Sequence, residues 1–370
     1  MKKQIATIAL LVTMSNAFAQ ESTAVPATTF AGSADAYYKY DFSGIDNSLT
    51  SFTNSHNSFE LGMASIEASH KRGKASVFVD LGFGNRASQF TYNDEATTFM
   101  IKQLNFSYEF TDKFKVIIGS FGTHIGYELL DAVDNKNYSM SYAFTYGPFF
   151  NTGIKAQYTS GKISFMAGVT NPTDFKTALE ADSSQKTFIG QFGYLGDTGS
   201  LYVNATSGSS NPSSVENKTQ FDVVATKKLS DTFSLGFNGT YALTNHDIDS
   251  NLDGKWFSLL GYATVALKDN LSLAYRIEYL GAKDATAALG SLAGTSVLGN
   301  TLSLNFKSGN LTVIPEFRLD KASEDIFTNS SAAPKGITAY ALLATTYSFF
   351  FFFFKLPISY RYWQFFYGIL

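Results

Sequence analysis

The stretch that decides the fold is LSLAYRIEY, residues 271–279. Its bulky apolar side chains fall on the odd positions, and small or polar side chains fall on the even positions. Because neighbouring side chains of a β-strand point to opposite faces, this order predicts a strand with one apolar and one polar face. The same period recurs at 103–110, 233–241 and 311–320. We therefore predict an all-β chain whose strands have two differently solvated faces.

The connections between these strands alternate between short and long. Tight turns are predicted at seven places, namely 71–73, 111–113, 160–161, 196–197, 230–231, 269–270 and 308–309. Eight longer polar segments separate them, at about 43–56, 86–97, 122–148, 171–185, 208–217, 244–254, 282–297 and 321–335. Fifteen connections predict about sixteen strands. Strands of about 10 to 14 residues are long enough to cross the hydrocarbon layer when tilted.

Alternation alone leaves two architectures open, since the strands of a soluble β-sandwich alternate as well. The order of connections favours a transmembrane antiparallel up-and-down β-barrel, which has short periplasmic turns and long outer loops. The composition agrees, with 35 Phe, 21 Tyr, 29 Gly and no Cys. An even strand number returns both chain ends to the periplasmic side and leaves no edge unpaired in lipid. Interfacial aromatic girdles are expected from Tyr37, Tyr38, Tyr40, Phe42, Tyr108, Phe110, Tyr158, Tyr194, Tyr262 and Tyr279.

The two ends of the chain differ from the repeating middle. Residues 1–19 have the features of a secretory signal peptide, with a basic start, an apolar segment over 5–14 and small residues before position 20. Beyond it, no run of eighteen apolar residues predicts a membrane helix. The barrel is expected over 20–349, with Phe349 as its C-terminal assembly signal. An unbroken run of six Phe from 349 to 354 ends the alternation. We interpret residues 350–370 as a suspect aromatic tail arising from read-through; a genuine tail at the periplasmic mouth is the alternative.

Several segments before about residue 175 resemble a known family. Residues 119–128 read GSFGTHIGYE, residues 137–139 read NYS, and residues 147–153 read GPFFNTG. With AYYKYDF at 36–42, they resemble the OmpL-like β-barrel porin-2 family of Bacteroidetes-type bacteria. The resemblance implies an outer-membrane barrel and a porin, and it implies little about the solute. The tail past Phe349 departs from the family pattern.

The longest connection is the candidate for a loop that narrows the pore. A barrel of sixteen strands is too wide for its wall side chains to fill, and this third outer loop, from about Gly122 to Gly147, is expected to fold inward. Its side chains expected at the constriction are Tyr127, Glu128, Asp131, Asp134, Lys136 and Tyr138. The lumen wall is expected to contribute Lys115, Arg276, Arg318, Glu278, Glu316, Glu109 and Asp80. Opposed charges would set a transverse field that selects solutes; alternatively, they pair with one another and only brace the wall or pin the loop.

The expected function is passive diffusion of small hydrophilic solutes or ions through a water-filled porin in the bacterial outer membrane. A substrate-specific channel for oligosaccharides or anions, and a non-conducting structural or adhesive barrel, remain open. Without Lys2, Lys3, Lys355 and Arg361, 24 bases face 31 acids, and this net charge of −7 predicts a mild cation preference. The expected partners are outer-membrane lipid, lipopolysaccharide and the outer-membrane assembly machinery. A homotrimer is expected by analogy alone.

Other function classes lack support in the sequence. His56, His70, His124 and His246 fall in a turn or in loops, away from any mid-strand nucleophile, so no catalytic residue is predicted and the protein is not expected to be an enzyme. No Cys or His cluster has metal-ligand spacing and no glycine pattern marks a phosphate loop, so no metal or other cofactor is expected. The net charge argues against nucleic acid as a partner.

Overall fold

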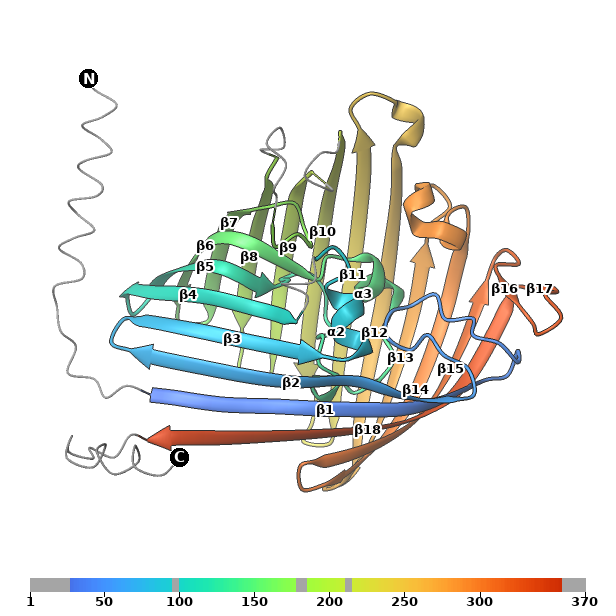
Figure 1. Ribbon diagram of the computed structural model, residues 1–370, viewed down its shortest axis with the longest axis horizontal. Coiled ribbons are helices and arrows are strands. Elements are labelled where there is room, and N and C mark those ends of the chain that lie inside the picture. Colours follow the sequence, from blue (N-terminus) through green and yellow to red (C-terminus); the bar gives the residue numbers. More distant parts are fainter. Residues whose placement is uncertain (1–26, 95–99, 178–184, 210–214, 355–370) are drawn as a thin grey trace, which may run out of the picture.

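The computed structural model describes residues 27–94, 100–177, 185–209 and 215–354. These residues form a closed antiparallel barrel of sixteen strands (Figure 1), which confirms the predicted fold class. The predicted signal peptide and the tail from residue 355 lie outside the described residues. The barrel strands are β1 (Ala27–Asp41), β2 (Ser58–Arg72), β3 (Ala75–Phe83), β4 (Ile101–Thr111), β5 (Phe114–Gly122), β6 (Phe150–Ser160), β7 (Ile163–Thr170), β8 (Thr187–Leu195), β9 (Gly199–Ser209), β10 (Glu216–Lys228), β11 (Phe233–His246), β12 (Gly254–Lys268), β13 (Leu271–Gly281), β14 (Ser296–Ser308), β15 (Leu311–Ala322) and β18 (Ile337–Phe354).

The connections follow the predicted order of short turns and long loops. Each predicted tight turn joins two paired strands, as at 309–310 between β14 and β15. The last long connection holds a small separate sheet of β16 (Phe327–Thr328) and β17 (Pro334–Lys335). No helix in the described ranges is long and apolar enough to cross a membrane.

The barrel closes where its first and last strands pair. The register of β1 and β18 runs from Ala27 opposite Phe354 to Asp41 opposite Tyr340. β18 therefore extends five residues past the boundary expected at Phe349, because the backbone of Ala27–Ala31 continues the ladder opposite residues 350–354. An antiparallel ladder needs only backbone groups, so the end of side-chain alternation does not end the strand.

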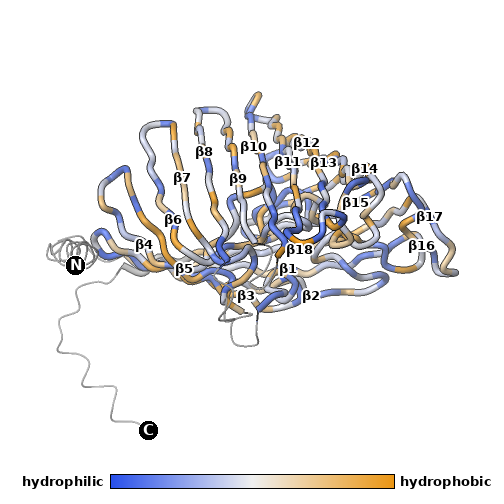
Figure 2. The backbone as a smooth tube through the Cα atoms, turned by 90° about the horizontal axis from the view of Figure 1, so that it is seen from above, coloured by the Kyte–Doolittle hydropathy of each residue, from blue (hydrophilic) through white to orange (hydrophobic). Residues whose placement is uncertain are grey.

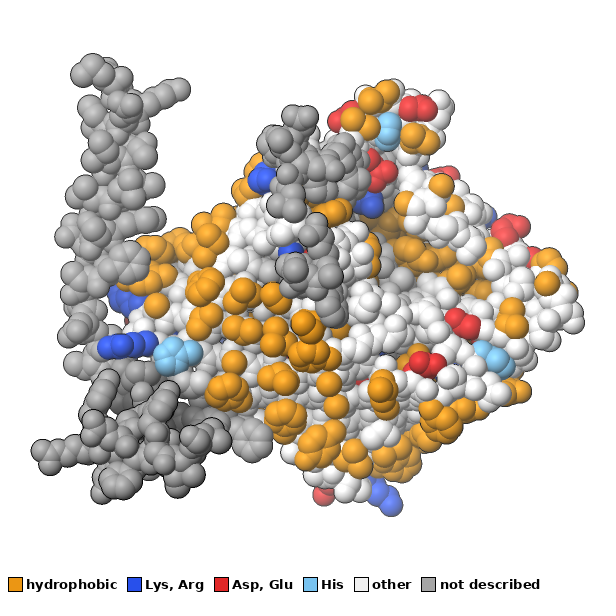
Figure 3. Space-filling model, in the orientation of Figure 1, with side chains coloured by type: hydrophobic (Ala, Val, Ile, Leu, Met, Phe, Trp, Pro, Cys, Tyr) orange, Lys and Arg blue, Asp and Glu red, His pale blue; other side chains and the backbone are white. Residues whose placement is uncertain are grey.

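The two faces of the strands are solvated as the alternation predicts. On β13, Tyr275 and Ile277 point outward with 37% and 42% exposure, whereas Arg276 and Glu278 point inward with 1% exposure. Figure 2 shows the same alternation of hydrophobic and hydrophilic residues along other strands, and Figure 3 shows hydrophobic side chains over the outside of the front strands. Apolar side chains exposed on a closed barrel are suited to contact lipid.

Two aromatic residues assigned to the girdles point inward instead. Tyr37 is 3% exposed and packs against Tyr138, and Tyr262 is 8% exposed and stacks on Tyr127. Consecutive residues of a strand face opposite sides, so Tyr37 and Tyr38 cannot both face lipid. The girdle assignment was wrong for these two positions because it relied on residue type rather than on the phase of the strand.

Outer loops fold into the lumen and fill part of it. The third outer loop lies inside the barrel, as predicted, and contains η1 (Ala132–Asp134) and α3 (Tyr142–Tyr146). The second outer loop also turns inward through α2 (Asn85–Phe90), and Figure 1 shows α2 and α3 together within the ring of strands. Phe52 of the first outer loop, Phe90 and Phe149 form an apolar cluster between these loops. The lumen is thus narrowed mainly by loops rather than by side chains of the wall.

Candidate pore constriction

A buried ion pair holds the third outer loop against the wall. The carboxylate of Glu128, on the loop, binds the guanidinium of Arg276, on β13, and their side chains are 5% and 1% exposed. Arg276 also donates to the carbonyl of Ser139 at 2.6 Å and to the hydroxyl of Thr301 at 3.1 Å. The second carboxylate oxygen of Glu128 accepts from the N–H of Ser141 at 2.8 Å. The pair therefore ties two parts of the loop to each other and to the wall.

Two further charges of β15 bind the loop backbone directly. Glu316 accepts from the N–H groups of Tyr138 at 2.6 Å and Ser139 at 3.1 Å. Arg318 donates to the carbonyl of Met140 at 2.6 Å. Buried backbone groups without a partner would be costly, so these wall side chains stabilise the inward path of the loop.

The start of α3 is bound in the same way. Glu278 accepts from the N–H of Ala143 at 3.0 Å, and Asp320 accepts from the hydroxyl of Tyr142 at 2.7 Å. Arg318 lies between these acids, 2.9 Å from an oxygen of Asp320 and 4.0 Å from an oxygen of Glu278. The wall cations are therefore neutralised by carboxylates close to them.

A lysine anchors the other side of the loop. The ammonium of Lys102, on β4, lies 2.6 Å from Asp131 of the loop and 2.9 Å from Asp80 of β3. It also donates to the hydroxyl of Ser65 at 2.9 Å. Lys102 is 1% exposed, so its charge is satisfied almost entirely within the protein.

Arg86 of α2 forms the centre of another buried contact. Its guanidinium donates to the carbonyl of Leu130 at 3.1 Å and lies 4.0 Å from the carboxylate of Asp35. It also lies over the rings of Phe52 and Tyr138, at 4.7 and 5.1 Å from their centroids. The hydroxyl of Tyr138 donates to Asp35 at 2.5 Å. The first, second and third outer loops therefore meet at this arginine.

The segment of the loop nearest β10 to β12 is fixed by a turn and a stacked ring. Gly126 has a φ of 93°, which favours glycine, and its N–H donates to Asp222 at 3.0 Å. The ring of Tyr127 stacks on Tyr262 with centroids 4.0 Å apart. A Cβ at Gly236 would come within 2.6 Å of the Tyr127 ring, so a side chain there would displace this contact.

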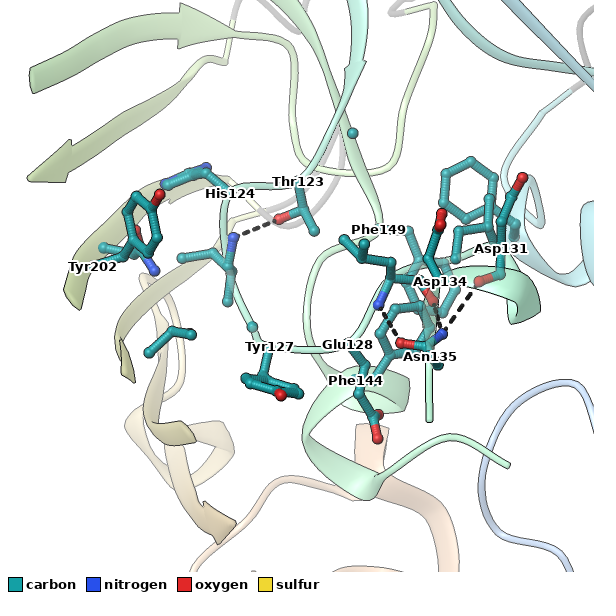
Figure 4. Close-up of a pocket in the computed structure, with 18 of the residues that line it drawn as sticks. Thr123, His124, Tyr127, Glu128, Asp131, Asp134, Asn135, Phe144, Phe149 and Tyr202 are labelled. Carbon is teal, nitrogen blue, oxygen red and sulfur yellow. Dashed lines mark hydrogen bonds between the residues drawn. The ribbon is translucent and has the colours of Figure 1, made fainter. Parts of the chain in front are cut away.

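A cavity of about 800 Å³ remains beside the loop, and Figure 4 shows part of its lining. The wall contributes polar groups from β8, β9 and β10, including Gln191, Asn204 and Thr226. Burial raises the pKa of Asp134, and the nearby carboxylate of Asp131 raises it further. The charged residues that line the cavity are Glu67, Asp80, Glu128, Asp131, Asp134, Lys102 and Lys136.

The sequence matches a family of channel proteins over most of its length. The family described as "Putative beta-barrel porin-2, OmpL-like" matches residues 27–351. The chain belongs to this porin family. The resemblance inferred from the loop motifs is confirmed, and the porin is an outer-membrane channel protein.

Solved structures agree with the fold of the porin. They include OmpT of Vibrio cholerae in a trimer form, with a TM-score of 0.59 and 12% identity over 88% of this chain and 100% of that one. An anion-selective porin from Comamonas acidovorans gives the same four values. The channel DcaP of Acinetobacter baumannii has a TM-score of 0.56 and 12% identity over 89% and 99% of the two chains. At this identity the likeness shows the fold alone. No curated protein sequence matches the porin.

The structure brings together most of the residues singled out from the sequence. Arg276, Arg318, Glu278 and Glu316 all bind the loop or one another. Asp80 joins Lys102 near the other anchor of the loop. The six loop residues lie on the inward loop, where Asp134 and Lys136 line the cavity and Tyr138 is fully buried.

Three residues singled out from the sequence lie apart from this cluster. Glu109 and Lys115 face each other in the β4–β5 register near the short turn, and Glu109 pairs with Lys71 at 2.7 Å, where both side chains are more than 40% exposed. Phe349 lies opposite Gly32 at the β1–β18 seam. Its role as an assembly signal stays a prediction.

Sequence reasoning missed Lys102 and Arg86. Lys102 lies two residues before Leu104, so the alternation predicts that both side chains point outward. A register shift between β3 and β4 beside Asp80 turns the side chain of Lys102 inward instead. Such a bulge gives no signal in the alternation pattern. Arg86 falls in a polar segment that reads as an ordinary outer loop, and only tertiary packing reveals its burial.

Proposed function

We propose that small hydrophilic solutes and ions diffuse passively through the cavity between the third outer loop and strands β8 to β10. The supporting observation is that the wall holds the loop at several points and still leaves a polar cavity open. Side chains of β13 and β15 bind the loop backbone, Lys102 of β4 and Asp222 of β10 bind the loop elsewhere, and the cavity lies toward β8 to β10. A loop held by contacts within the protein narrows the lumen whether or not a solute is present.

The charges around the cavity support a weak preference for cations. Arg276 and Arg318 are each paired with carboxylates, so neither presents an unpaired positive charge to a passing solute. The described lining contains five carboxylates and two lysines. Asp134 faces the cavity without a salt bridge to any described residue. Excess negative charge in a narrow polar passage raises the local concentration of cations.

A non-conducting structural barrel is the second candidate, and the inward packing of three outer loops favours it. Phe52, Phe90 and Phe149 form an apolar cluster inside the lumen. Electrical conductance distinguishes the two candidates, because a sealed barrel passes no ions.

The proposal includes no catalytic step. His124, the histidine nearest the constriction, uses its Nε2 atom in a contact of 3.0 Å with the carbonyl of Ala205. His70 contacts the hydroxyl of Thr28 near the short-turn end. We propose a homotrimer by analogy with the trimer form of OmpT. Lipid and lipopolysaccharide are proposed partners of the outward face and the outer loops.

The test is conductance of the purified porin in a planar bilayer, with the reversal potential measured across a salt gradient. The expected result is a steady open channel whose reversal potential favours cations. Asp134→Asn should reduce this preference, and the control Asp231→Asn, at an exposed turn, should leave it unchanged. A barrel without conductance would overturn the diffusion proposal. An unchanged reversal potential in Asp134→Asn would overturn the role of Asp134.

A further inference from the structure

A second, smaller cavity lies in the outer half of the lumen. Its volume is about 220 Å³, and it is lined by the end of the third outer loop, by the outer ends of β9 to β12 and by residues 286–289. Residues 145–148 of the loop and 218–220 of β10 both line it. At about 30 Å³ per water, it holds roughly seven waters. This volume suits one small solute rather than a drug-sized ligand.

Two buried polar groups in this cavity have no partner among the described residues. They are the side-chain amide Nε2 of Gln220 and the hydroxyl of Thr206, and each residue is 7% exposed. Buried donors and acceptors of this kind are costly unless a water or a ligand satisfies them. The amide and the hydroxyl are therefore available to bind a solute that carries hydroxyl groups.

Three aromatic residues also line the cavity. Tyr92, Tyr146 and Trp256 come from three different elements and meet at the same cavity. Rings of this kind offer flat apolar faces at low conformational cost. A sugar ring has apolar C–H faces and a rim of hydroxyl groups, so it matches a cavity that combines rings with unpaired amide and hydroxyl groups.

The charges at the cavity are already engaged. Asp174 accepts from the N–H groups of Phe149 at 2.7 Å and Phe150 at 2.9 Å, and from the hydroxyl of Tyr92 at 3.1 Å. The ammonium of Lys218 lies 3.7 Å from the carboxylate of Glu216. The remaining recognition groups are neutral, which favours a neutral ligand over an ion.

We propose that this outer cavity is a binding subsite for a neutral polyhydroxylated solute of about one sugar ring. The aromatic residues contact the ring faces, and Gln220 and Thr206 bind its hydroxyl groups. The inference rests on the proposed function, because the solute reaches the cavity through the lumen. It deepens that function by naming a class of solute that the porin binds on the outer side of the constriction.

Trp256 provides a direct test, since the chain has 2 Trp residues and the other, Trp363, lies outside the described residues. The purified porin in detergent is titrated with glucose while tryptophan fluorescence is recorded. We expect a saturable change that disappears in Trp256→Phe. Gln220→Leu should weaken binding by roughly three- to tenfold, the loss expected for one neutral hydrogen bond. Thr206→Val, a second variant, should weaken it as well.

The matched control is Gln157→Leu, the same substitution on the lumen side of β6 and away from this cavity. It should bind glucose like the wild type. A conducting porin without a saturable fluorescence change would overturn the subsite and leave the proposed function intact. Equal affinity in wild type, Gln220→Leu and Thr206→Val would also overturn it. Saturable binding to a porin that does not conduct would support the subsite and overturn diffusion.

Discussion

Replacing Glu128 with Gln tests whether the wall charges hold the third outer loop in place. The substitution keeps the shape of the side chain and removes the charge that faces Arg276. Glu128 accepts from the N–H of Ser141 and from Arg276 with two different oxygens, and Gln has an oxygen at only one of these two positions, so one of the two contacts is lost. Arg276 would then keep its contacts with the carbonyl of Ser139 and the hydroxyl of Thr301, and the nearby charge of Glu278.

The magnitude follows from the burial of the pair. Removing one partner of a buried ion pair costs about 3–5 kcal/mol, because the other charge is left uncompensated. Gln retains part of the hydrogen bonding, so we expect a value near the lower end, about 3 kcal/mol. This corresponds to about a hundredfold shift in the equilibrium between the docked and undocked loop. The contacts of Glu316 and Arg318 with the loop backbone remain, so the loop should undock transiently rather than permanently.

Single-channel recording in a planar bilayer is the assay. Glu128→Gln should show larger conductance and more open-channel noise than the wild type. Glu109→Gln is the matched control, because Glu109 pairs with Lys71 at an exposed site where such a bridge contributes about 1 kcal/mol or less. If Glu128→Gln and the wild type have the same conductance, noise and ion preference, the pair does not hold the loop.

Four further outcomes are expected. Burial raises the pKa of Asp134, so on acidification this side chain should lose its charge, and the channel part of its cation preference, at a higher pH than an ordinary aspartate would. The reversal potential of Asp134→Asn should not show this change with pH. Burial raises the pKa of Asp174 to about 6, above its value in the unfolded chain, so the free energy of unfolding should fall as the pH rises through 6. In urea unfolding, Asp174→Asn should lose up to about 3 kcal/mol of this pH dependence. The prediction is contradicted if the wild type and Asp174→Asn show the same dependence of unfolding free energy on pH. Lys102→Met leaves Asp80 and Asp131 buried without their cation and should lower the free energy of unfolding by about 3–5 kcal/mol in urea titrations. Adding Asp131→Asn should recover part of this loss. A double variant as unstable as Lys102→Met would argue against the ion pair of Lys102 with Asp131. Gly236→Ala should displace the Tyr127 ring and alter conductance, and an unchanged channel would show that the stacked ring does not shape the passage.

The barrel could be predicted from the sequence because two independent patterns agree. Period two in stretches such as 271–279 sets the faces of each strand, and the order of short and long connections sets the closure. Both patterns are local, so neither depends on contacts between distant residues. The register shift beside Asp80 is different, because a bulge changes which side chain points inward without changing the residues themselves.

The constriction could be predicted only in part. Arg276, Glu278, Glu316 and Arg318 lie on the polar face of clearly alternating strands, so their inward direction followed from phase. The partner of each side chain could not be predicted from the alternation, since a contact such as that between Glu128 and Arg276 joins residues far apart in the chain. The outer cavity around Gln220 was not foreseen at all, because no periodic pattern connects β9 to β12 with the end of the third outer loop.

The seam between β1 and β18 has a consequence for folding. Ala27 and Phe354 stand at opposite ends of the described chain, so this pairing is the most non-local in the barrel. Contacts of such long range form slowly, since the intervening chain has to be ordered before they form. Until the final strand arrives, the growing sheet has two open edges that can pair with another polypeptide. Pairing of β1 with β18 is therefore the step that removes both open edges at once.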